Sequence, residues 1–409
     1  MDRDRIATTH VGSLVRPPEL VEILHARSQQ RQGNRGGGAP GSGAEVEAGR
    51  YERTLRQAVD GVVRRQVEVG LDIVSDGEFG KGISWSRYVL ERLDGFEYRA
   101  APDAGPRPAA GAVVPDTEER RRFSDFYAEY DRTQGFEGDI GAWVCTGPVR
   151  YRAHETLRRD IDNLKDALQQ AGGGQGFLPA VAPASVASGR QNEHYATDEE
   201  LLFAVADALR SEYQAIVDAG LVLQVDDAWF PMMYELLVPP GTLEDYRRWA
   251  QVRVEALNHA LAGLPEERVR YHVCWGSWNA PHTGDIPLRE IIDLVLRVRA
   301  GGYSLEQANP RHEHEWRIWE DVELPRGKVL LPGVISHATN VVEHPELVAE
   351  RLTRLAHLVG PDRVVGSTDC GFAQGPFVQR VHPTIMWAKL ASLVEGANLA
   401  SRELYGARA

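Results

Sequence analysis

Residues 221–227 read LVLQVDD, an almost continuous apolar run that ends in two acidic residues. Similar runs recur toward the C-terminus at RVRYHVCWG (268–276), YSLEQANP (303–310), KVLLPGVIS (328–336) and RVVGSTDCGF (363–372). Segments with helical apolar spacing lie between most of them, at 242–262, 287–299 and 345–359. Strands that are apolar throughout and alternate with helices are typical of a parallel sheet covered on both faces.

The first half of the chain follows the same alternation less regularly. Residues 6–9 form a short β-type run, 46–69 have helical spacing, and LDIVSDGEFG (71–80) is a short strand with an acidic end. A helix follows over 154–171 and a strand over 177–186. About eight strand–helix units favour a closed (β/α)8 TIM barrel of the α/β class over an open doubly wound sheet.

Two segments interrupt this alternation. Residues 31–46 are rich in Gly, Ser and Pro, which predicts a flexible loop within the first helical region. Residues 98–140 are polar and irregular, which predicts an insertion. We therefore expect residues 1–409 to form a single barrel domain with these two excursions.

Composition excludes several classes of protein. The 46 basic and 59 acidic residues give a net charge of −13, which disfavours a dedicated nucleic-acid binder. No apolar run approaches the roughly 18 residues of a membrane helix, and the N-terminus has no signal-like apolar region. Three cysteines argue against a disulfide framework. We expect a cytoplasmic protein without membrane or nucleic-acid partners, which could form a homo-oligomer.

Polar side chains gather where the apolar runs end. These residues are Asp76, Glu78, Asp226, Asp227, His272, Cys274, Glu306, His337, Asp369 and Cys370. The C-terminal strand ends of a barrel build its active site. Emergence into solvent explains polar strand ends as well, although it accounts for acids better than for cysteines.

Four of these residues match the ligand preferences of zinc. His272 and Cys274 are two positions apart, so on a strand they point to the same side. Glu306 ends the next run and Cys370 the last. One nitrogen, two sulfurs and a carboxylate suit Zn²⁺. The alternative interpretation is two buried cysteines and a core histidine.

Seven motifs carry a family resemblance. They are THVGSLVRP (9–17), DIVSDGEFGK (72–81), LVLQVDD (221–227), YHVCWG (271–276), YSLEQANPRHEHEW (303–316), PGVISHATN (332–340) and STDCGF (367–372). On these motifs the chain resembles the C-terminal catalytic domain of cobalamin-independent methionine synthase. It is more similar still to the single-domain branch that includes the epoxyalkane:coenzyme M transferases (2-hydroxypropyl-coenzyme M lyase). The resemblance implies a (β/α)8 barrel with a catalytic zinc held by His272, Cys274, Glu306 and Cys370.

The resemblance also implies roles around the metal. The stretch Val11, Gly12 and Ser13 matches the part that contacts the homocysteine carboxylate, and Glu78 and Asp226 match the acids that hold its amino group. Arg16 resembles the single-domain branch and could clamp a sulfonate, carboxylate or phosphate, or lie on the surface. His337 lies near the histidine that serves as the proton donor.

Two further groups are ambiguous. His312 and His314 either support the site or are exposed loop histidines. Four tryptophans crowd the same loops and either stack on a substrate or pack in the core: Trp275, Trp278, Trp316 and Trp319.

These expectations define a reaction. A zinc-bound thiol is deprotonated while its sulfur stays nucleophilic, and a carboxylate ligand such as Glu306 is the easiest to displace. We expect transfer of a methyl or alkyl group from a donor to a small thiol, homocysteine or a related one. The alternative is epoxyalkane:coenzyme M transferase or 2-hydroxyalkyl-thiol lyase chemistry. Further alternatives are a metal-free barrel lyase or decarboxylase, and a non-catalytic barrel that senses thiols or stores zinc.

Overall fold

A computed structural model describes residues 4–34, 43–100, 116–133 and 141–406. Its centre is a sheet of eight parallel strands, in the order β1-β11-β10-β9-β8-β7-β5-β2. These strands are β1 (Ala7–Thr8), β2 (Ile73–Val74), β5 (Gln175–Val181), β7 (Val222–Asp227), β8 (Val269–Val273), β9 (Gly302–Glu306), β10 (Val329–Ile335) and β11 (Val365–Thr368). Chain order and spatial order agree around the ring, which confirms the predicted (β/α)8 barrel.

The two end strands of the sheet approach each other and nearly close the ring. The backbone N–H of Asp72 donates to the Thr8 carbonyl over 3.1 Å, and that of Leu14 donates to the Gly77 carbonyl over 3.1 Å. The Asp72 side chain also accepts the Thr8 backbone N–H over 2.8 Å. These bonds replace the regular ladder that such short strands cannot form.

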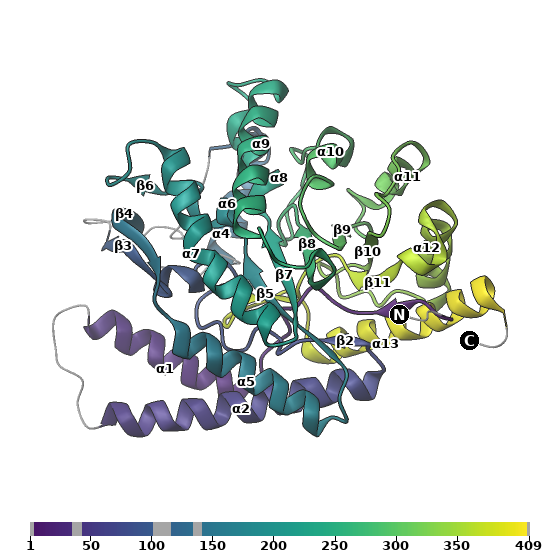
Figure 1. The fold of residues 1–409 in the computed structure, drawn as a ribbon, viewed down its shortest axis with the longest axis horizontal. Helices are drawn as coiled ribbons and strands as arrows, with labels where there is room; N and C mark the ends of the chain where they lie inside the picture. The colour runs from purple at the N-terminus through teal and green to yellow at the C-terminus, as the bar shows by residue number, and fades with distance from the viewer. Residues whose placement is uncertain (1–3, 35–42, 101–115, 134–140, 407–409) are drawn as a thin grey trace.

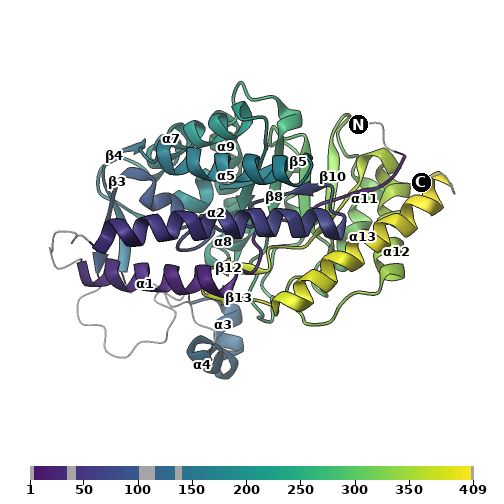
Figure 2. The ribbon, with the colours of Figure 1, turned by 90° about the horizontal axis from the view of Figure 1, so that it is seen from below.

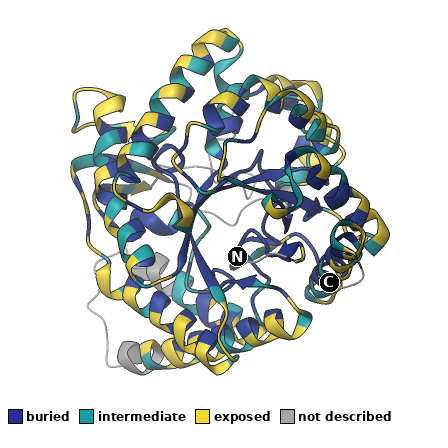
Figure 3. Ribbon diagram, turned by 45° about the vertical axis from the view of Figure 1, so that its right-hand side comes forward, coloured by how far each residue is buried: buried dark blue, intermediate teal, exposed yellow. Residues whose placement is uncertain are grey.

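Helices surround the barrel, with buried faces toward the strands and exposed faces outward (Figures 1 and 3). The long ones are α1 (Pro18–Asn34), α2 (Gly43–Val69), α5 (His154–Gln170), α7 (Asp198–Asp218), α9 (Leu243–Ala260), α12 (Pro345–Val359) and α13 (Pro383–Tyr405). The short ones are α6 (Pro183–Ala187), α8 (Trp229–Leu237), α10 (Ile292–Val295) and α11 (Ile318–Asp321). The predicted helix at 287–299 is therefore broken: a 3-10 turn at Leu288–Glu290 precedes the four residues of α10.

Alternation along the strands separates an apolar outer face from a polar interior. Val225, Tyr271 and Leu305 join the main hydrophobic core. On each of these strands the neighbouring residues in sequence are polar and point into the barrel. Arg270 illustrates how hydrogen bonds in the interior satisfy these polar groups. Its guanidinium donates to Gln224 Oε1 over 2.7 Å, and also to the Thr9 hydroxyl and the His10 carbonyl. This layer forms the floor beneath the strand ends.

The segment 31–46, predicted as a loop, is helical at the edges that the structure describes. Helix α1 continues to Asn34 and α2 already begins at Gly43, while 35–42 lie outside the described residues. Gln, Arg, Ala and Glu at the edges of this segment are good helix formers, which explains why the helices extend into it.

The predicted insertion at 98–140 adjoins a small side sheet. Strands β3 (Leu93–Ala100) and β4 (Gly141–Tyr151) pair antiparallel, and β6 (Gln191–Asn192) adds to β4. Between them, α3 (Glu118–Arg122) and α4 (Ser124–Thr133) project from the barrel (Figure 2), and 101–115 and 134–140 lie outside the described residues. A hairpin of β12 (Ala373–Gly375) and β13 (Val378–Gln379) follows β11. No helix within the described ranges is long and apolar enough to cross a membrane.

Candidate functional site

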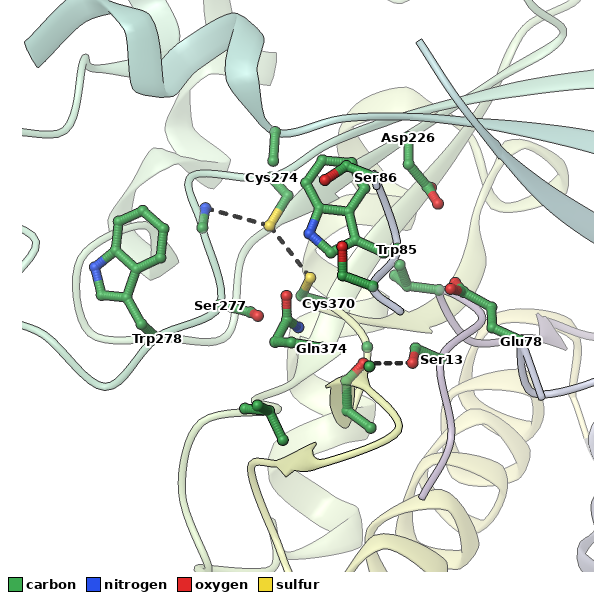
Figure 4. A pocket seen from close by; sticks show the side chains of 18 of the residues that line it. Ser13, Glu78, Trp85, Ser86, Asp226, Cys274, Ser277, Trp278, Cys370 and Gln374 are labelled. Carbon is green, nitrogen blue, oxygen red and sulfur yellow. Dashed lines mark hydrogen bonds between the residues drawn. The ribbon is translucent and has the colours of Figure 1, made fainter. Parts of the chain in front are cut away.

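Two sulfurs and an imidazole meet at the C-terminal ends of β8 and β11. The Sγ atoms of Cys274 and Cys370 lie 3.2 Å apart (Figure 4). One ligand atom each of His272, Cys274 and Cys370 lies within 4.8 Å of the others, and all three residues are buried. The sequence prediction that these three side chains converge is therefore matched by the geometry.

The His272 imidazole has one nitrogen engaged and one free. Nδ1 lies 3.1 Å from the Ser304 hydroxyl. Nε2 is buried and has no hydrogen-bond partner among the described residues. Burial lowers the pKa of His272 to about 4, so the ring is neutral at pH 7 and offers a lone pair.

The Cys370 thiol opposes ionisation of Cys274. The hydrogen bond with Cys370, and then burial, raises the pKa of Cys274 well above its usual range. Two thiolates 3.2 Å apart in a buried site require a cation between them. An unpaired imidazole nitrogen and two sulfurs form a donor set that fits Zn²⁺.

Glu306 lies beside this group but is not one of its three members. Its Oε1 accepts the backbone N–H of Trp275 over 3.0 Å, and its Oε2 accepts the Asn309 amide over 2.8 Å. Asn309 also donates to Asp369, which accepts two further backbone N–H groups. Burial raises the pKa of Glu306 to about 7. The fourth predicted ligand is thus fixed near the sulfurs by hydrogen bonds.

A cavity of about 210 Å³ opens beside the cysteines and has a polar end and an aromatic end. Asp226 and Glu78 lie on one side of the sulfur pair, and Trp278 lies on the other (Figure 4). Val11 and Ser13, which the resemblance assigns to substrate binding, also line it.

Glu78 is held in an unusual backbone conformation. Its φ of 62° lies in the left-handed region that non-glycine residues avoid. Its N–H donates to Asp76 Oδ1 over 2.9 Å, and its Oε2 lies 3.1 Å from Lys81 Nζ. Gly12 makes room for it, because a Cβ there would meet Glu78 Oε1 at 3.0 Å and Pro179 Cγ at 2.6 Å. Gly12 therefore shapes the polar end without lining the cavity.

Asp226 is the second carboxylate of the polar end. It accepts the Gln224 amide over 2.6 Å and is buried. Burial raises the pKa of Asp226 to about 7, and the charge of Glu78 adds to this shift. Two carboxylates at one end of the cavity, of which Glu78 is paired with Lys81, can accept a cationic group.

Besides Gly12, the predicted substrate residue Arg16 and the predicted proton donor His337 do not line this cavity. Arg16 is buried, and its Nη2 donates to the carbonyls of Glu78 and Lys81. It lines a separate groove with Arg65 and Trp387, so it supports the Glu78 turn from behind. His337 is also buried, and neither of its ring nitrogens has a partner among the described residues. Burial lowers the pKa of His337 to about 3.

The structure resolves the ambiguous aromatic and histidine residues. Trp278 lines the cavity and Trp275 is buried behind it, whereas Trp316 lines a surface groove and Trp319 is in the core. His312 is buried and His314 is exposed.

Sequence reasoning missed two walls of the cavity, the segment 83–87 and the hairpin of β12 and β13. The segment 83–87 lines it throughout, and Trp85 and Met232 pack against Ala228 and the cysteine pair. The only sequence signal is the position of ISWSR directly after DGEFGKG. Irregular turns such as this one have no periodic pattern of apolar residues, so their sequence does not indicate where their side chains lie.

Comparisons with known proteins agree with this architecture. No protein-family model matches the sequence. Methionine synthase of Thermococcus kodakarensis is 22% identical over 409 residues, which cover 99% of this chain and 96% of that protein. 2-hydroxypropyl-CoM lyase of Xanthobacter autotrophicus is 24% identical over 388 residues, covering 87% of this chain and 88% of the lyase.

A solved structure shares the fold over nearly the whole chain. A B12-independent methionine synthase from Shewanella sp. W3-18-1, in complex with selenomethionine, superposes with a TM-score of 0.69 and 20% identity. The match covers 98% of this chain and 99% of that structure. Homologues of this chain therefore include methionine synthase-like proteins and 2-hydroxypropyl-CoM lyase, both named for enzymes.

Proposed function

We propose that the protein is a zinc-dependent enzyme that transfers a methyl or alkyl group to a small amino-thiol. The observation that carries this proposal is one cavity with the His272, Cys274 and Cys370 donor atoms beside the carboxylates of Glu78 and Asp226. The full-length similarity to methionine synthases supports the same type of reaction.

We propose His272, Cys274 and Cys370 as metal ligands and Glu306 as the fourth. The unpartnered Nε2 of His272 is the observation that favours coordination, since a buried nitrogen without a partner is costly. Zinc bound there would supply a Lewis acid that lowers the pKa of a substrate thiol and keeps its sulfur nucleophilic. Ser304, through Nδ1, and Asn309 orient the His272 ring and the Glu306 carboxylate.

The polar end selects the thiol. An ammonium group that leaves water needs carboxylate partners, and Glu78 and Asp226 face the cavity where such a group would lie. Lys81 neutralises part of this charge through its 3.1 Å pair with Glu78. Val11 and Ser13 border the same end, where the carboxylate of homocysteine or a related thiol would lie.

His337 is the proposed proton donor. Because burial lowers its pKa to about 3, the ring is neutral at pH 7. Its two unpartnered nitrogens leave an N–H free to donate and a lone pair free to accept. We propose that it relays a proton: one ring nitrogen accepts a proton from water while the other gives its N–H proton to the leaving group, so the ring stays neutral throughout.

Thiol chemistry on an epoxide is the second candidate. The lyase relative supports it, and so does Arg87, which lines the cavity. No carboxylate partner of the Arg87 side chain occurs in the described ranges, so its guanidinium could hold the sulfonate of a thiol such as coenzyme M. The same site would catalyse the reverse, lyase direction.

Metal analysis followed by a thiol panel tests the proposal. The purified protein should contain about one zinc per chain. Incubation with amino-thiols and methyl or epoxide donors should give alkylated products by mass spectrometry. Turnover with no bound metal would favour a metal-free lyase or decarboxylase, and metal without turnover of any pair would favour a non-catalytic barrel.

A further inference from the structure

A chain of four titratable side chains lies behind the aromatic end of the cavity. His282 Nδ1 lies 3.0 Å from Asp285, whose Oδ2 also lies 3.1 Å from His312 Nε2. His312 Nδ1 lies 2.9 Å from Glu315. The side chains are 4–15% exposed, so solvent contributes little to these bonds. We call these four residues the His282 chain.

One end of the His282 chain holds Trp278. The rings of His282 and Trp278 stack with centroids 5.5 Å apart at an angle of 16°. His282 Nε2 also bonds the Trp278 carbonyl over 2.9 Å. His282 has a φ of 53°, a strained conformation that these two contacts keep in place.

Trp278 in turn packs on the backbone of Gly276, next to the Cys274 sulfur. A Cβ on Gly276 would lie 2.5 Å from the Trp278 ring, so the indole packs directly on that glycine. The Gly276 N–H donates to Cys274 Sγ over 3.3 Å (Figure 4).

The other end of the His282 chain reaches the carboxylate. The rings of His312 and Trp275 lie 4.3 Å apart. The Trp275 backbone N–H donates to Glu306 Oε1 over 3.0 Å.

We propose that His282 and His312 are positioning residues of the metal centre. His282 acts through Trp278 and keeps the Gly276 N–H on the Cys274 sulfur. His312 acts through Trp275 and keeps a second N–H on Glu306. This inference rests on the proposed function, because it gives these N–H donors the task of stabilising the anionic ligands of a metal.

The physical reason is charge. Two thiolates and a carboxylate exceed the charge of one divalent cation, and an incoming thiolate adds another negative charge. Charge-assisted N–H bonds to sulfur and carboxylate lower this cost only if the donors are held in place. A loop with a strained residue and a glycine cannot hold them without outside support.

Cobalt(II) is the probe that tests this inference. It replaces zinc in sulfur sites and gives a sulfur-to-metal charge-transfer absorption that reports on the ligand sulfurs. We compare wild type with His282→Gln, His312→Gln and the matched control His314→Gln, which changes an exposed histidine of the same loop. Trp278→Leu removes the ring on which His282 stacks and which packs on Gly276, so it is the second route to the same effect.

We expect the first two variants and Trp278→Leu to shift the charge-transfer band and to weaken cobalt binding by about tenfold. His314→Gln should match wild type. A band and an affinity that are unchanged in all variants, with cobalt bound to wild type, overturn the positioning role and leave the metal site standing. Failure of wild type to bind cobalt or zinc overturns both proposals. Circular dichroism identifies any variant that has lost its fold, and the remaining variants then decide.

Discussion

The sulfur atoms of Cys274 and Cys370 lie 3.2 Å apart although 96 positions separate the two residues in the chain. The barrel produces this contact because β8 and β11 both end at the same rim. No local sequence feature around either cysteine indicates that the two side chains lie in contact.

Removal of one sulfur should abolish metal binding. Cys370→Ala leaves two of the three clustered donors, and we expect the purified variant to hold less than about a tenth of a zinc per chain. Cys145→Ala is the matched control, because Cys145 is buried in β4 and its thiol lies 3.5 Å from the Gly147 carbonyl. Elemental analysis of both proteins measures the effect. Stoichiometric zinc in Cys370→Ala would contradict the ligand assignment.

Asp226 and Asp227 are adjacent on β7, but their substitution by asparagine should have different effects. Asp226→Asn should raise the KM of an amino-thiol roughly 10- to 100-fold, equivalent to about 1.5–3 kcal/mol, and should change the KM of a thiol without an amine far less. Asp227→Asn should lower stability instead, because Asp227 accepts the Ser185 and Tyr271 hydroxyls over 2.7 and 3.0 Å. Equal effects of Asp226→Asn on both thiols would argue against an ammonium pocket.

Arg87 distinguishes the two candidate substrates. If the thiol carries a sulfonate, Arg87→Gln should raise its KM by roughly tenfold or more while Arg87→Lys retains part of the binding. The KM of an amino-thiol should stay the same in both variants. A panel of initial rates with each thiol measures this, and an unchanged KM for the sulfonate thiol would remove the structural support for the epoxide reaction.

The His282 chain predicts a pH dependence of stability. Burial alone would lower the pKa of His312, but its bonds to Asp285 and Glu315 raise it to about 10. Because the folded-state pKa of His312 lies above its unfolded value of about 6.5, protonation of His312 stabilises the folded protein. This stabilisation is fully present below pH 6.5 and is lost as the pH rises toward 10. Between pH 6.5 and about 10, His312 keeps a proton in the folded protein that it loses in the unfolded protein.

Unfolding of wild type and His312→Gln by urea between pH 6 and 10 measures this contribution. The difference between the two free energies of unfolding should shrink by up to about 1.4 kcal/mol per pH unit above pH 6.5. Buried carboxylates that do not interact with His312 affect both proteins alike and cancel in the difference. A difference that is constant across this range would show that His312 is neutral in the fold.

The barrel could be predicted because its strands carry a strong and repeated signal. Strand ends in a (β/α)8 barrel meet at one rim, so the convergence of His272, Cys274 and Cys370 followed from topology and residue type. Topology also placed Glu78 and Asp226 at this rim, but together with Asp76 and Asp227, and the family resemblance alone singled them out. The family resemblance supplied their roles.

The remaining features depend on side-chain direction and loop packing. Arg16 follows a cavity residue by only three positions, yet its guanidinium turns to the carbonyls behind Glu78. Trp85 packs against the cysteines from an irregular turn, whose residues show no periodic apolar pattern. The His282 chain joins two loops through Asp285, and its bonds depend on a positive φ that the sequence does not signal at a histidine.

X-ray absorption at the zinc edge, before and after addition of an amino-thiol, tests the central proposal most directly. The proposal predicts a first shell of two sulfurs and two lighter atoms in the free protein, from His272, Cys274, Glu306 and Cys370. A third sulfur should appear when the thiol binds, with loss of one oxygen as Glu306 withdraws. A protein without zinc, or a sulfur count that stays at two with saturating thiol, would contradict it.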